Sequence, residues 1–120
     1  MLAAELDAPL IVYTNADWRE EPLVFAVGSI ATLDDFTGCS IIGGLYVDGT
    51  LVLDMNSTST TRTAIALPST VNIAVLQADI AALVASASGG LRDYQLSLVL
   101  VTATGSKQPL VVGIARIQNP

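Results

Sequence analysis

The stretch Tyr46-Val47-Asp48-Gly49-Thr50-Leu51 predicts a β-hairpin and decides the fold class. An Asp-Gly pair between two apolar runs favours a two-residue type I′ turn, because both turn residues need a positive φ. This turn sets a register in which Val47 faces Thr50, Tyr46 faces Leu51, Leu45 faces Val52 and Gly44 faces Leu53. One face of the hairpin is then expected to carry Ile42, Tyr46, Leu51, Leu53 and Met55.

The other face of the hairpin carries Leu45, Val47 and Val52, so both faces are substantially apolar. An antiparallel strand in a free-standing sandwich has a polar outer face as a rule. We therefore expect the hairpin to be covered twice, once by its own core and once by a partner subunit. Leu45, Val47 and Val52 are the predicted contact residues.

The hydrophobic period along most of the chain is two, which is typical of strands. Residues 93–102, 71–75 and 110–117 follow this pattern, and the adjacent glycines Gly43 and Gly44 predict a bulge or a close backbone approach. Residues 79–88 depart from it, since Ile80, Leu83, Val84 and Ala87 have helical spacing; Asp79 is the expected cap. The pattern predicts an all-β, antiparallel β-sandwich of about seven or eight strands with one short helix near residues 79–88, with a small barrel as the alternative.

One domain is expected from a chain of 120 residues. Residues 1–16 are interpreted as an N-terminal arm plus a first short strand, and residues 17–120 as a single β-sandwich domain. Leu2 and Leu6 of the arm are candidates for docking on a neighbour. Trp18 is expected to be a core or interface anchor, as a single Trp in a small β domain usually is, and we count it among the predicted contact residues.

Composition points to an assembly component, because 52% of residues are hydrophobic and only 13% are charged, against about a quarter in an ordinary domain. The net charge of −6 and five scattered basic residues argue against nucleic-acid binding. No apolar stretch reaches the roughly 20 residues of a membrane-spanning helix. The acidic N-terminus lacks the pattern of a secretory signal, which predicts synthesis in a cytoplasm.

Catalysis and metal binding are not expected. The chain has no histidine and a single cysteine, Cys39, so Ser-His-Asp, Cys-His and zinc sites are excluded. The carboxylate pairs Glu20-Glu21 and Asp34-Asp35 are adjacent in sequence, which in a strand would place the two groups on opposite faces. We predict no catalytic, cofactor-binding or metal-ligating residue.

The order of motifs is similar to that of the immunoglobulin-like N-terminal domain of tailed-phage upper baseplate proteins and of related fibre and spike base domains. The segments that carry the resemblance are Asp17-Trp18-Arg19, Asp35-Phe36-Thr37-Gly38 before strand 40–47, the Ala-rich helix, Tyr94-Gln95-Leu96 after Gly90, and Leu110 to Ile117. Phe36 stands where leucine is usual, and Gly90 precedes Tyr94 by four residues rather than two. The resemblance covers residues 17–117 and implies an immunoglobulin-like sandwich.

The resemblance also implies that the chain is a structural virion protein made in the host cytoplasm. Such a protein would dock a fibre, spike or baseplate component as an adaptor, base or decoration module. Its partners would be further copies of itself, as a homo-oligomer, and other virion proteins. A carbohydrate- or ligand-binding β-sandwich is the alternative, and a self-assembling shell or filament subunit is a third hypothesis.

Overall fold

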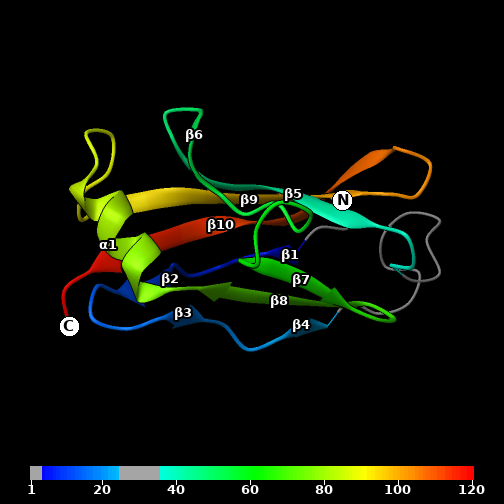
Figure 1. Cartoon of the computed structure of the whole chain (residues 1–120), viewed down its shortest axis with the longest axis horizontal. Helices are drawn as coiled ribbons and strands as arrows, with labels where there is room; N and C mark the ends of the chain where they lie inside the picture. The colour runs from blue at the N-terminus through cyan, green and yellow to red at the C-terminus, as the bar shows by residue number, and fades with distance from the viewer. Residues whose placement is uncertain (1–3, 25–35) are drawn as a thin grey trace.

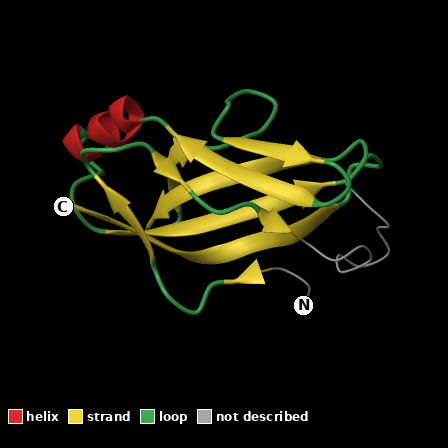
Figure 2. Ribbon diagram, turned by 90° about the horizontal axis from the view of Figure 1, so that it is seen from below, coloured by secondary structure: helices red, strands yellow, loops and turns green. Residues whose placement is uncertain are grey.

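Two β-sheets and one short helix make up the fold of the described residues (Figure 1). A computed structural model describes residues 4–24 and 36–120. These residues lie mostly in strands, which confirms the predicted all-β sandwich with one short helix. Figures 1 and 2 show the helix at one end of the sandwich, beside the C-terminus.

The larger sheet has the order β1-β10-β9-β5-β6, with β2 also paired to β10. Both β1 and β2 run parallel to β10, while the β10–β9, β9–β5 and β5–β6 pairs are antiparallel. The last two long strands, β9 and β10, therefore form a hairpin. The strands of the larger sheet are β1 (Ala4–Glu5), β2 (Leu10–Tyr13), β5 (Ser40–Val47), β6 (Thr50–Asp54), β9 (Asp93–Val101) and β10 (Lys107–Gln118).

The smaller sheet is built around β8 (Thr70–Val75). On one side β8 pairs with β7 (Thr63–Ala66), and on the other with β3 (Trp18–Arg19) and then β4 (Leu23–Val24). All of these pairs are antiparallel.

The strand order of the two sheets is that of a variable-type immunoglobulin sandwich. In that order β10, β9, β5 and β6 correspond to strands G, F, C and C′, and β3 with β4, β8 and β7 correspond to B, E and D. The Tyr94 hydroxyl, at the start of β9, donates a 2.7 Å hydrogen bond to the Gly90 carbonyl. This bond has the geometry of the tyrosine corner found in such sandwiches.

Helix α1 (Gln77–Ala85) connects the two sheets and buries Ile80 and Leu83. It begins earlier than its apolar spacing indicates, and Asp79 lies in its first turn, so the prediction of Asp79 as the cap is wrong. The Asp17 carboxylate accepts a 2.8 Å hydrogen bond from the Gln77 backbone N–H instead. The residue that satisfies this helix end is 60 positions away in sequence, so local spacing could not reveal it.

The core lies between the sheets, and one set of alternating residues on β9 forms its centre. Leu96, Leu98 and Leu100 are completely buried. The buried positions of β8 alternate in the same way and supply the facing layer of side chains, which consists of Val71, Ile73 and Val75.

The β5–β6 hairpin confirms its predicted turn but only half of its predicted register. Asp48 has φ 50° and Gly49 has φ 80°, as a type I′ turn requires. Tyr46 pairs with Leu51 as expected, but a bulge then makes Leu45 pair with Leu53 rather than with Val52. The extra residue opposite β5 is Val52. Beyond the bulge, every residue of β6 is shifted by one position relative to the prediction.

Gly43 and Gly44 confirm the predicted close approach of backbones. Gly43 has φ 108°, and a Cβ there would lie 2.2 Å from the Ser97 carbonyl oxygen on β9. A Cβ on Gly44 would lie 1.9 Å from the Leu53 carbonyl oxygen on β6. These neighbours are backbone atoms in the middle of a sheet, so they have little freedom to move aside. The two glycines therefore let β5 sit between β9 and β6.

We predict that Gly43→Ala lowers the free energy of unfolding by at least about 3 kcal/mol, because it adds a steric clash to an unfavourable φ. The control is Gly49→Ala, which also has a positive φ but has no atom within 4 Å of the added Cβ; it should cost about 1 kcal/mol. Urea denaturation of both variants measures the difference. Equal losses would contradict the close-approach explanation.

Candidate protein-interaction surface

The candidate surface is the side of the larger sheet that points away from the smaller sheet. On β9 the even-numbered residues Tyr94 to Leu100 are buried, so the odd-numbered residues point outward. A residue on a neighbouring strand that pairs with an outward residue of β9 points outward as well. On β10, Val112 pairs with Ser97 and Ile114 with Gln95. On β5, Ile42 pairs with Val99. The apolar residues of this side are called the outer face: Ile11, Tyr13, Ile42, Tyr46, Leu51, Val99, Val101, Val112 and Ile114.

The outer face is in contact with solvent. Ile11 is 39% exposed, Tyr13 44% and Leu51 42%. The six others are partly exposed. A patch of this kind on a small protein marks an interaction site more often than scattered apolar residues do.

Within the described residues, the charged residues of the outer face lie at its margins, except the pair of Arg116 and Asp93, which lies beside Ile11. Val112, Ser97 and Gly44 are paired with one another across β10, β9 and β5. Glu5 on β1 and Asp54 on β6 lie at the two ends of this row of paired residues. Lys107 lies at one end of the face. Apart from that pair, the positions inside these margins that are not apolar are the uncharged Gln95, Ser97 and Gly44.

An ion pair lies beside Ile11, at the end of the outer face where β2 pairs with β10. The Arg116 Nε atom lies 2.7 Å from Asp93 Oδ1, and Nη2 lies 3.2 Å from Oδ2. The hydrogen bond from Arg116 lowers the pKa of the Asp93 carboxyl and raises the pKa of Arg116 itself. Both side chains are about half exposed, so this pair contributes little to stability.

Two of the predicted contact residues are buried in the chain's own core, so that prediction is wrong for them. Leu45 is 1% exposed and Trp18 is 3% exposed. The Trp18 indole N–H donates a 2.8 Å hydrogen bond to Glu20 Oε1, which satisfies its polar atom. Neither side chain has a surface to offer a partner.

The remaining predicted contacts belong to the core margin. Val47, Val52 and Leu6 are half-buried and pack against the core. Leu6 occupies the space over Gly113 on β10, where a Cβ would come within 2.7 Å of the leucine side chain. The first described residues of the arm thus dock on this chain itself, through β1 and β2. Leu2 and the pair Asp34-Asp35 lie outside the described residues.

The hairpin residues of the outer face were expected on the core side. Ile42, Tyr46 and Leu51 point outward, whereas Leu45, Leu53 and Met55 form the core side. The bulge at Val52 explains how Leu51 and Leu53 separate onto different faces. A signal for the outer face does exist in the sequence, because Val99 and Val101 are apolar at odd positions of strand 93–101.

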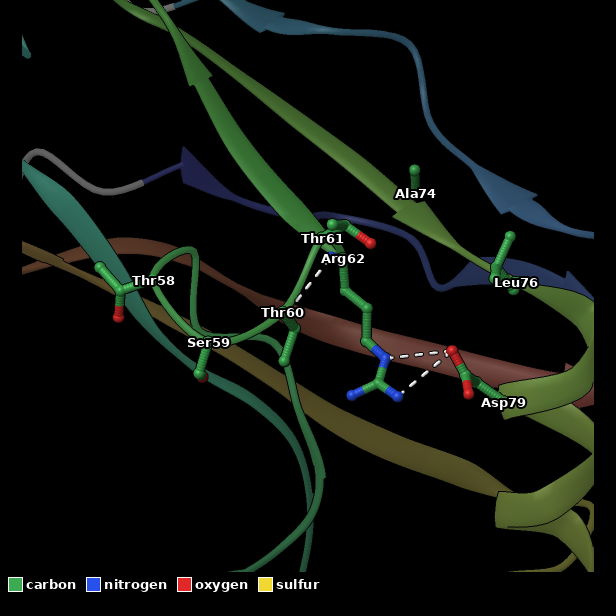
Figure 3. Close-up of a pocket in the computed structure, with 8 residues that line it drawn as sticks. All are labelled: Thr58, Ser59, Thr60, Thr61, Arg62, Ala74, Leu76 and Asp79. Atoms are coloured by element: carbon green, nitrogen blue, oxygen red, sulfur yellow. Dashed lines mark hydrogen bonds and ion pairs between the residues drawn. The ribbon is translucent and has the colours of Figure 1, made fainter.

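A second feature is an open groove of about 660 Å³ between the loop at residues 58–62 and the start of α1 (Figure 3). Arg62 extends across it toward Asp79, and its Nη2 lies 3.2 Å from Asp79 Oδ2. Arg62 Nη1 also donates a 2.7 Å hydrogen bond to the Asp54 carbonyl. The guanidinium thereby ties the end of β6 to α1, which is a structural role.

We predict that Arg62→Ala lowers the free energy of unfolding by about 1–2 kcal/mol, because it leaves a partly buried carboxylate and a carbonyl without their donor. The matched control is Arg19→Ala. Arg19 is 66% exposed and lies 3.8 Å from Asp17, so its loss should change stability by less than about 0.5 kcal/mol. Thermal and urea unfolding check this pair, and an effect of Arg19→Ala as large as that of Arg62→Ala would contradict the structural role.

The rest of the described chain offers little further chemistry. Residues 4–24 and 36–120 contain no group of three or more metal-ligating side chains. No helix in the same ranges is long and apolar enough to cross a membrane. Comparison of the chain with protein-family models, curated proteins and solved structures found no match.

Proposed function

We propose that this chain is a non-catalytic assembly protein that associates with other protein through the outer face. The observation that carries the proposal is the outer face itself: nine apolar side chains on one side of a sheet, with one ion pair beside Ile11 and the other charges at its margins among the described residues. In an antiparallel sheet facing water, this side is normally polar. Covering it with protein removes apolar surface from water, which favours association.

The setting that we propose is the virion of a tailed phage. There the chain would act as an adaptor, base or decoration module that docks a fibre, spike or baseplate component. The support for this setting is the order of motifs in residues 17–117, together with an apolar surface suited to permanent contacts. The partners would be further copies of the chain and other virion proteins.

A carbohydrate-binding role has less support. Stacking on a sugar needs neighbouring exposed aromatic rings, but Trp18 and Tyr94 are 3% and 1% exposed. Tyr13 on β2 and Tyr46 on β5 share the outer face, but β10 and β9 lie between them. The described aromatic residues therefore form no common platform.

Light scattering across a dilution series of the purified 120-residue protein tests the proposal, with a glycan array measured in parallel. We expect an oligomer of fixed size over the accessible concentration range and no glycan binding, because the outer face is satisfied by protein. A monomer at every concentration would contradict the proposed function. Glycan binding by that monomer would favour the carbohydrate-binding alternative.

A further inference from the structure

The edge of β10 that points away from β9 is covered near Val112 by the start of the chain. Strand β1 pairs there with Val111 and Val112, in parallel. The Leu6 backbone N–H then donates a 2.9 Å hydrogen bond to the Val112 carbonyl. Residues 4–6 are called the strap, because they close this edge of the larger sheet without adding a full strand to it.

The strap is set apart from the neighbouring strand β2. Glu5 pairs with Val112, whereas Leu10 pairs with Ala115, so the arm advances five positions while β10 advances three. The arm therefore bulges away from β10 between β1 and β2. Pro9 stands directly before β2 and has no N–H to donate. The strap can detach at this bulge while β2 stays paired.

One side chain holds the strap in place. Within residues 5–8, Leu6 is half-buried and the other three residues are exposed. Leu6 lies over Gly113, where an added Cβ would come within 2.7 Å of the leucine Cδ1 atom and 2.8 Å of its Cβ atom. A segment with one anchoring side chain and a pairing of two residues belongs to the least stable parts of a fold.

The part of β10 beneath the strap is suited to pairing with another strand. Residues 110–115, Leu-Val-Val-Gly-Ile-Ala, carry no charge, and half of them are β-branched. Uncharged segments of this length and β-propensity pair with other chains when they lie at an open sheet edge. Pro109 and Arg116 flank the segment, and such residues interrupt this pairing. The strap covers the stretch that has no such protection of its own.

We propose that the strap prevents β10 from pairing with β10 of a second copy, and that Leu6 over Gly113 is its latch. Once the strap is released, two identical edges can pair antiparallel around a two-fold axis, which joins the two sheets into one. This contact uses the backbone groups of a sheet edge, whereas the proposed function uses the side chains of the outer face. The two therefore stand or fall separately.

The first variant, Leu6→Ser, removes the latch and leaves the sequence of β10 unchanged. The Val112 carbonyl points to the strap, and the Val112 N–H points the same way, because both groups of one strand residue lie on one side. At low protein concentration, we expect hydrogen exchange at the Val112 amide to accelerate by at least about 10-fold. At high concentration, the molar mass should at least double relative to the unchanged chain, with an infrared band of intermolecular β-sheet.

The second variant, Gly113→Ala, displaces the latch from the opposite side and should have the same two effects. The control is Leu91→Ser, which makes the same change as Leu6→Ser at a leucine that is 51% exposed. It should change neither the exchange nor the molar mass. Thermal unfolding followed by circular dichroism verifies that every variant remains folded.

A double variant, Leu6→Ser with Val112→Pro, tests which edge pairs. Proline at position 112 removes the N–H that faces the open edge and keeps an apolar side chain on the outer face. We expect the double variant to return to the molar mass of the unchanged chain, because the released edge can no longer complete its hydrogen bonds with a second copy.

Unchanged exchange at Val112 in both Leu6→Ser and Gly113→Ala would overturn the latch. Faster exchange without additional association would overturn the pairing of two β10 edges, and so would association that Val112→Pro fails to reverse. The proposed function survives each of these results, because it concerns the unchanged chain. If the unchanged chain is monomeric while Leu6→Ser associates, the strap is supported and the proposed function is contradicted.

Discussion

The buried side of strand β9 is entirely apolar from Leu96 to Leu100, and the rest of the structure depends on this constraint. Its even positions, Leu96, Leu98 and Leu100, are completely buried and hold the two sheets together. Its outward positions Val99 and Val101 remain in contact with solvent. Covering outward apolar side chains such as Val99 and Val101 with other protein removes apolar surface from water, which favours association. The sandwich covers one side, and the proposed assembly covers the other.

Backbone geometry makes the outer face continuous across the sheet. Gly43 and Gly44 allow β5 to pass within backbone contact of β9 and β6, so no side chain interrupts the surface there. The bulge at Val52 turns Leu51 outward while Leu53 stays in the core. Where β2 pairs with β10, the Arg116–Asp93 ion pair lies beside Ile11 and separates Ile11 and Tyr13 from the other apolar residues of the face.

The sequence predicts the fold well, because period-two alternation, the Asp-Gly turn and the helical spacing near Ile80 are local signals. It predicts the surface poorly. A single-residue bulge reverses the faces of a strand, and nothing in the local sequence marks Val52 as bulged. Leu45 and Trp18 were expected at an interface but lie in the core, because local sequence does not show which of two apolar sides of a strand points inward. The docking of Leu6 over Gly113 depends on residues more than 100 positions apart, which no local pattern contains.

The most direct test of assembly through the outer face is methyl NMR of the unchanged chain in the presence of a water-soluble nitroxide. Methyl groups of Val99, Val112 and Ile114 should resist paramagnetic broadening as strongly as the core methyl groups of Leu98, because a second molecule excludes the probe. The methyl groups of Leu67, which is 62% exposed, should broaden and serve as the reference. Broadening of Val99, Val112 and Ile114 well beyond that of Leu98 at high protein concentration would show the face open to water and contradict its role in assembly.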